Sequence, residues 1–166
     1  MAKNSSFDVT TGVDLQEVDN AVNQAMSEVS TRYDFKGTNC TIEFDRAAAT
    51  LKLDADDELK LKALFDVLQA RMVRRKVPVK NLDLGAVDVG SMGRVRQEIG
   101  LKQGIPQDTA KQIVKDIKDL KLKKVQASIQ GDQLRVQAPK RDDLQEVINF
   151  LKGEDYGVEL QFGNYR

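Results

Sequence analysis

The spacing of apolar residues predicts four amphipathic helices. In four stretches the apolar side chains recur three or four residues apart, which places them on one face of a helix. These stretches begin at Asp14, near Asp56, at Pro106 and after Pro139. Aspartate favours the position that caps a helix start, and proline favours the first helical position. Gly153 is a typical stop signal at the end of the fourth stretch.

Shorter stretches in which polar and apolar residues alternate predict strands between the helices. They cover residues 7–11, 40–44, 51–53, 95–101, 125–129, 134–138 and 158–162, with a weaker candidate at 78–84. Two of them are separated by Gly131-Asp132 alone, and such a pair of turn-forming residues predicts a β-hairpin.

Together these elements follow the order β-α-β-β-α-β twice. The order predicts an α+β fold of two ferredoxin-like units, residues 1–90 and 91–166, each an antiparallel sheet with its helices on one face. The stretch Gly85–Gly93 holds three of the eleven glycines, which predicts a turn or linker between the units. It lacks the Gly-Lys-Ser/Thr ending of a phosphate-binding P-loop.

The composition argues against catalysis. The chain has no histidine, the commonest general base and metal ligand. Its one cysteine, Cys40, alternates with Ile42 and Phe44, so we expect a buried and inert thiol. The acidic pairs Asp56-Asp57 and Asp142-Asp143 stand at helix starts, where negative charge stabilises the helix dipole. We therefore predict a binding protein that is not an enzyme and has no catalytic residues, cofactor or metal site.

The sequence also predicts where the protein resides. No apolar run approaches the roughly 18 residues of a membrane helix, and the first residues lack a signal pattern. One cysteine allows no intrachain disulfide, which fits a reducing compartment. We expect a cytoplasmic protein with no membrane partner.

Charge is distributed unevenly although the formal net charge is zero. Residues 1–90 carry 12 basic and 15 acidic residues, and residues 91–166 carry 14 and 11. A cluster of lysines dominates the basic half: Lys111, Lys115, Lys118, Lys121, Lys123 and Lys124. The first three share one face of the third helix, opposite its apolar residues. That face either contacts nucleic-acid phosphates or is an ordinary solvated helix surface.

The open face of the second predicted sheet is a further candidate site. It is rich in amide groups and flanked by cations, with Arg96, Lys102, Gln126, Gln130 and Arg135 as candidate ligand contacts. It carries none of the aromatic residues on which an RNA-recognition motif stacks bases. A ligand would be held there by hydrogen bonds and charge, or by aromatic residues from elsewhere, such as Tyr156, Phe162 or Tyr165. Alternatively, two polar sheet faces meet each other in the folded protein.

A third candidate follows the first helix. Arg32, Tyr33, Phe35 and Lys36 alternate basic and aromatic side chains, a pattern that can stack on and neutralise a nucleotide. The same residues are equally typical of a helix end, with the aromatic rings as anchors and Gly37 as the turn.

Motifs along nearly the whole chain resemble the bacterial YajQ family. In the first half they are Ser6-Phe7-Asp8-Val9, Val13-Asp14-Leu15-Gln16-Glu17-Val18 and Arg32-Tyr33-Asp34-Phe35-Lys36-Gly37. In the second half they are Leu101-Lys102-Gln103-Gly104-Ile105, Ile129-Gln130-Gly131-Asp132-Gln133, Lys140-Arg141-Asp142-Asp143-Leu144-Gln145 and Leu160-Gln161-Phe162. The departures are small: Lys3-Asn4-Ser5 replaces a shorter start, and Tyr165 stands where the family usually has Phe.

The resemblance implies a cytosolic nucleotide-binding protein. Its implied ligands are purine nucleotides and RNA, including tRNA, or a cyclic nucleotide that acts as a signal to a protein partner. It also implies that the two ferredoxin-like domains exchange their first strands, so that residues 6–11 complete the sheet of the other unit. The alternative function is a protein-interaction module with only incidental affinity for polyanions. No family motif fixes the nucleotide site, so the candidate residues remain those named above.

Overall fold

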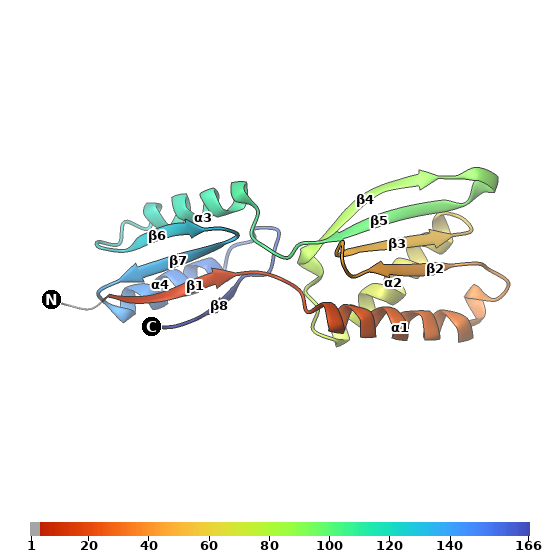
Figure 1. The fold of residues 1–166 in the computed structure, drawn as a ribbon, viewed down its shortest axis with the longest axis horizontal. Coiled ribbons are helices and arrows are strands. Elements are labelled where there is room, and N and C mark those ends of the chain that lie inside the picture. The colour runs from red at the N-terminus through yellow and green to blue at the C-terminus, as the bar shows by residue number, and fades with distance from the viewer. Residues whose placement is uncertain (1–3) are drawn as a thin grey trace. The chain divides into compact units, whose positions relative to one another are not determined.

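The computed structural model describes residues 4–166, which form two four-stranded antiparallel sheets and four α-helices (Figure 1). One sheet has the order β6-β7-β1-β8, with β1 at Ser5–Thr10, β6 at Gln126–Gln130, β7 at Gln133–Ala138 and β8 at Gln161–Gly163. The other has the order β2-β3-β5-β4, with β2 at Thr41–Asp45, β3 at Thr50–Ala55, β4 at Leu82–Val89 and β5 at Val95–Leu101. The predicted α+β class is confirmed.

The helices begin where the sequence predicts. They are α1 at Leu15–Thr31, α2 at Glu58–Arg74, α3 at Gln107–Asp119 and α4 at Arg141–Lys152. The Asp14 carboxylate accepts a hydrogen bond from the Gln16 amide at 2.9 Å, and the Asp57 carboxylate accepts one from the Lys60 amide at 2.7 Å. These bonds satisfy amides that have no partner inside the helix. Short 3₁₀ turns lie at Tyr33–Phe35, Val79–Asn81 and Ser91–Gly93.

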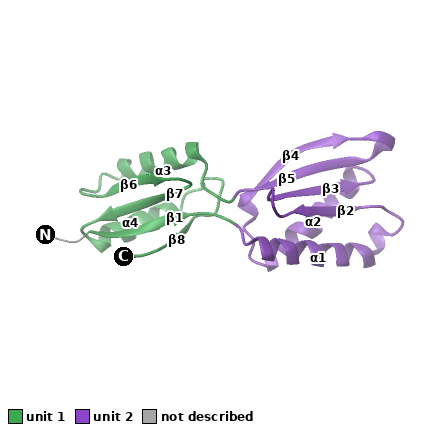
Figure 2. Cartoon of the chain, in the orientation of Figure 1, with its two compact units in different colours: residues 1–12, 103–166 green, residues 13–102 purple. Residues whose placement is uncertain are grey.

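The chain forms two compact units (Figure 2). Unit 1 joins residues 103–166 to the described residues up to Gly12, and unit 2 is residues 13–102. The sequence repeat predicts a boundary at residue 90, but the compact units have boundaries after residues 12 and 102. The strand pairing explains the difference. β1 lies between β7 and β8, and β5 lies between β3 and β4. Each is therefore a central strand of its sheet.

The sequence predicts a turn or linker over Gly85–Gly93, and the structure has the turn at the end of this stretch but a strand, not a linker, before it. β4 continues through Gly85 to Val89 and pairs with β5, with a shift in register between Leu84 and Val87. A side chain at Gly85 would place its Cβ only 2.6 Å from the Glu98 carbonyl oxygen. Glycine thus permits a close approach of two strands at a bulge, and the turn itself comes later, at residues 90–94.

Each unit has its own apolar core under two helices. In unit 2, α1 and α2 pack on one face of the sheet around Leu51, Leu53 and Ile99, and Cys40 is buried there as predicted. In unit 1, α3 and α4 cover Phe7 and the apolar residues of β7. The Gly131-Asp132 hairpin is confirmed, with Gln130 opposite Gln133. Among the described residues, no helix is both long and apolar enough to span a membrane.

Candidate nucleic-acid interface

The third helix presents three lysines to solvent because its opposite face is buried. Ala110, Ile113 and Ile117 pack into the core of unit 1. Lys111, Lys115 and Lys118 are exposed on the other side of the helix. The predicted division of α3 into an apolar and a basic face is confirmed.

Three more lysines follow the end of α3. Lys121 and Lys124 adopt left-handed backbone conformations with φ of 56° and 65°, and the Leu122 side chain between them packs against the core. This loop leaves the side chains of Lys121, Lys123 and Lys124 exposed. We call the six lysines from Lys111 to Lys124 the lysine surface.

The lysine surface has no internal charge partner. Within residues 4–166, none of its six lysines forms an ion pair or a hydrogen bond through its side chain. The nearby acid Asp116 is engaged elsewhere, accepting hydrogen bonds from Gln112 and from the Tyr156 hydroxyl, each at 2.7 Å. Burial, followed by this contact with Asp116, raises the pKa of Tyr156 above its ordinary value.

The predicted polar sheet face is divided between the two units. Gln126, Gln130 and Arg135 lie together in the sheet of unit 1, where β6 pairs with β7. The placement of Arg96 and Lys102 on this face is wrong, because β5 and the residue after it belong to unit 2. β1 takes the central position that the sequence assigned to β5.

Arg135 is fixed by the carboxylate of Asp8, a residue outside the predicted candidate sites. Its Nε donates to Asp8 Oδ1 at 3.0 Å, and Asn164 donates to Asp8 Oδ2 at 2.6 Å. The hydrogen bond from Arg135 holds the pKa of Asp8 below its ordinary value, although burial of that carboxyl acts in the opposite direction. The only sequence signal was the polar position of Asp8 between Phe7 and Val9 in an alternating strand.

Arg96 is likewise engaged, in a network of polar contacts within unit 2. Its Nε donates to Asp54 Oδ2 at 2.8 Å, and Arg94 contacts the other oxygen of the same carboxylate. Burial raises the pKa of Asp54, but the bonds from the two arginines outweigh it and the pKa lies below its ordinary value. Arg94 also donates to Asp56 at 3.1 Å.

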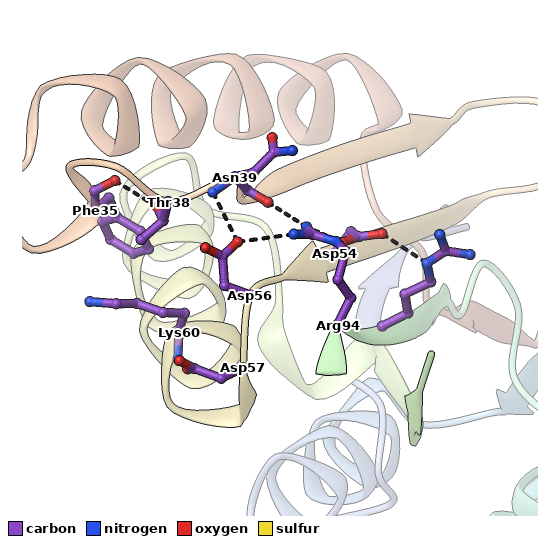
Figure 3. A network of polar contacts seen from close by, with 9 residues as sticks. Phe35, Thr38, Asn39, Asp54, Asp56, Asp57, Lys60 and Arg94 are labelled. Atoms are coloured by element: carbon purple, nitrogen blue, oxygen red, sulfur yellow. Dashed lines mark hydrogen bonds and ion pairs between the residues drawn. The ribbon is translucent and has the colours of Figure 1, made fainter. Parts of the chain in front are cut away.

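The rest of this network ties the loop after α1 to the start of α2. The Asn39 amide donates to Asp56 Oδ1 at 2.9 Å, and Arg94 donates to the Asn39 carbonyl (Figure 3). The Thr38 hydroxyl donates to the Phe35 carbonyl at 2.6 Å. These contacts are satisfied within unit 2, so the network acts as a structural brace.

The motif after α1 has the structure of a helix end. Phe35 is buried, with Arg32 and Lys60 at 5.4 and 5.7 Å from the centre of its ring. Arg32 is paired with Asp34 at 2.8 Å and with Glu28 at 3.2 Å. Arg32 is still partly exposed, but of the four candidate residues only Tyr33, 88% exposed, and Lys36 face solvent without an ion pair or a ring contact among the described residues.

Pairing, rather than charge count, distinguishes the two units. Counted over the compact units, residues 13–102 carry 14 basic and 15 acidic residues, and the remainder carries 12 and 11. The following arginines of unit 2 are all held by carboxylates: Arg32, Arg71, Arg75, Arg94 and Arg96. Among the described residues, unit 2 also has unpaired lysines, such as Lys36, Lys52 and Lys62, but the six of the lysine surface lie within fourteen consecutive residues of unit 1.

Comparison with known proteins identifies the family of this chain. A family model described as "Nucleotide-binding protein YajQ-like" matches residues 5–166. The chain belongs to this YajQ-like family. The resemblance seen in the sequence motifs is thereby confirmed, and it extends over nearly the whole chain.

Relatives in the family are similar over their full lengths. A protein of Oleidesulfovibrio alaskensis is 52% identical over 97% of this chain and 98% of its own length. One of Carboxydothermus hydrogenoformans is 50% identical over the whole of both chains, and one of Magnetococcus marinus is 53% identical over 97% and 98%. Each of the three is named a nucleotide-binding protein.

Proposed function

We propose that this protein binds nucleotides and RNA, including tRNA, without transforming them, and that phosphates contact the lysine surface. One observation carries the proposal: six exposed lysines lie within fourteen residues and have no ionic partner in residues 4–166. The family and the names of its members support nucleotides as the ligand class.

An unpaired lysine is better suited to bind phosphate than the paired arginines of unit 2. Arg96 would have to give up its bond to Asp54 before it could bind a ligand. A lysine of the lysine surface gives up only its hydration, and phosphate binding releases counterions from the nucleic acid. The lysine surface is therefore the first place where a polyanion would dock.

Binding without catalysis is supported by the side chains that the sequence offers. The chain has no histidine to serve as a general base, and its glycine-rich stretch is a strand and a turn rather than a P-loop. We infer a cytoplasmic setting, which the lone buried cysteine supports. Purified protein is expected to show no turnover of ATP or GTP; turnover that a surface substitution abolishes would refute the non-catalytic proposal.

The test of the lysine surface is a triple substitution, Lys111→Gln, Lys115→Gln and Lys118→Gln. Affinity for fluorescent single-stranded RNA of several sequences is measured by anisotropy over a range of salt concentrations. We expect all sequences to bind more weakly, and the logarithmic salt slope to fall by about 2, since each phosphate contact with a single strand contributes about 0.7.

A matched control removes the same charge from unit 2. Lys36, Lys52 and Lys62 are exposed and also make no ion pair among the described residues, and their replacement by glutamine tests the motif after α1 as well. The control should retain the slope. Equal losses in both triple variants, or no loss in either, would refute the assignment of the lysine surface.

A second candidate function, a protein-interaction module, is favoured by the β4–β5 turn. Val89 and Met92 are 68% and 99% exposed there, and contiguous exposed apolar side chains are a common feature of interaction sites. Under this alternative, Met92→Ser would abolish binding of the protein partner. RNA affinity would depend only on net charge, so the two triple lysine variants would lose the same affinity.

A further inference from the structure

Unit 1 contains a pocket that none of the candidate sites above includes. Its volume is about 320 Å³, close to the lower end of the roughly 300–1,000 Å³ typical of small-molecule sites. It lies where the N-terminal half of α4 faces the start of β1 and the chain after β8. Its lining residues are Ser5, Ser6, Phe7, Arg141, Leu144, Gln145, Ile148, Tyr165 and Arg166.

The floor of the pocket is apolar and its rim is cationic. Phe7, Leu144 and Ile148 line the pocket and are buried core residues, of which Leu144 and Ile148 keep 6% and 5% of their surface exposed. Arg141 and Arg166 stand at the rim, and no acidic residue lines the pocket. Neither guanidinium forms an ion pair within residues 4–166, although the charge of Arg166 helps to lower the pKa of the Asp8 carboxyl.

An aromatic side chain is held at the mouth of this pocket. Tyr165 is 65% exposed, with its ring centre 6.4 Å from that of Phe7 and its hydroxyl donating to the Phe162 carbonyl at 3.4 Å. The neighbouring backbone is fixed, because Arg166 and Ser6 exchange amide–carbonyl bonds of 3.0 and 3.1 Å. Tyr165 thus offers a ring face that is already ordered but largely in contact with water.

These features together define the chemistry of a ligand. The apolar floor and the exposed ring suit a planar aromatic group, which gains by stacking and by leaving water. The two unpaired guanidinium groups suit a phosphate, which they can bind through charge-assisted hydrogen bonds. The hydroxyl of Ser5 and the side-chain oxygen of Gln145, whose Nε2 donates to Asn149 at 2.9 Å, offer polar contacts to a sugar or to a base edge.

We propose that this pocket binds a purine mononucleotide, with the base against Tyr165 and the phosphate at Arg141 and Arg166. The proposal rests on the proposed function for its ligand class, but it uses a different surface from RNA binding at the lysine surface. A purine is favoured over a pyrimidine because its larger ring covers more of the tyrosine and of the apolar floor.

The experiment is a calorimetric titration of the full chain with GMP and AMP at 0.15 and 0.5 M KCl. Guanosine, ribose 5-phosphate and inorganic phosphate are the partial ligands. We expect GMP or AMP to saturate one site, to bind at least about tenfold more tightly than each partial ligand, and to lose less affinity with salt than RNA does, because stacking is not screened. Affinity equal to that of inorganic phosphate would overturn the proposal.

Two substitutions locate the site. Tyr165→Ala removes the stacking face and Arg141→Gln removes one phosphate contact, and each should weaken GMP about tenfold or more. Tyr165→Phe, which keeps the ring, should bind as the parent does. Leu59→Ala and Arg74→Gln are exposed controls in unit 2 that belong to none of the candidate sites, and they should have no effect. Circular dichroism confirms folding of each variant.

The outcomes separate this proposal from the proposed function. If GMP binding survives Tyr165→Ala and Arg141→Gln, the pocket is not the site, whatever the lysine variants do. If the pocket variants lose GMP while the lysine triple variant keeps its RNA affinity, the pocket stands and RNA binding at the lysine surface fails.

Discussion

Replacing Arg135 with glutamine should destabilise unit 1 without touching its apolar core. Asp8 is a buried residue, only 5% exposed, and its carboxylate accepts hydrogen bonds from Arg135 and Asn164. Without the guanidinium it keeps one donor, and an under-satisfied buried charge costs about 1–3 kcal/mol. The cost stays below the roughly 3–5 kcal/mol of a fully buried pair, because the Arg135 side chain itself remains 28% exposed.

Amide hydrogen exchange is the appropriate assay, because the two units need not unfold together. The free energy of opening is measured for amides of β7, such as Leu134 and Val136, in the parent and in Arg135→Gln. Arg96→Gln is the matched control. Arg96 is 70% exposed and its partner Asp54 retains Arg94, so we expect a loss below about 1 kcal/mol, confined to unit 2.

The pH dependence of the free energy of unfolding is an independent test of the same interaction. The pKa of Asp8 is lowered in the folded state, so its contribution is present above the unfolded value of about 3.9 and is lost as the pH falls through the folded value. Asp8→Asn should therefore flatten the acid limb of the stability profile of unit 1. An Arg135→Gln variant with unchanged β7 protection, or an Asp8→Asn variant with an unchanged acid limb, would refute the reasoning.

Two further predictions concern the backbone. Gly85→Ala should lower the free energy of unfolding of unit 2 by about 1–3 kcal/mol in urea denaturation, since the new Cβ would meet the Glu98 carbonyl. Gly100→Ala is the control and should be nearly neutral, because its Cβ would make only an ordinary 3.7 Å contact. Equal effects of the two substitutions would contradict the account of the bulge. Residues 13–102, expressed alone, should fold cooperatively, whereas residues 1–90 should not, because they lack the central strand β5; a well-folded 1–90 fragment would contradict this.

Local patterns predicted most of the secondary structure. The Asp14 and Asp57 caps, the proline before α3 and the glycine after α4 each act within one turn of a helix, so neighbouring residues suffice to reveal them. The β6–β7 hairpin is equally local, since Gly131 supplies the positive φ that its turn requires.

The errors arose where a residue's role depends on distant partners. The sequence predicts a turn or linker at Gly85, because a glycine that ends a strand and one that permits a bulge look alike in sequence. The difference lies in the Glu98 carbonyl across the sheet, thirteen residues away. The sequence pattern places Arg96 on the wrong sheet for a similar reason. Its strand pairs with β3 and β4, and alternation alone does not say which neighbours a strand will have.

Candidate binding residues were limited by the same missing information. Sequence spacing placed Lys111, Lys115 and Lys118 on one exposed face, because the apolar face of α3 determines where they point. It could not show that Arg32 and Arg96 are held by carboxylates, since their partners are set by side-chain geometry. It also missed the pocket at Arg141, whose walls come from both ends of the chain.

The boundaries of the compact units also change how much the net charge of each unit can attract RNA. The difference between the halves of the sequence, −3 against +3, shrinks to −1 against +1 when the strands are counted in the units where they lie. A unit with one excess charge creates little field beyond the Debye length of roughly 8 Å in physiological salt. Attraction of RNA must then come from the unpaired lysines themselves. Its salt dependence will consequently report how many of the six contact phosphate, and will be insensitive to the net charge of the unit that carries them.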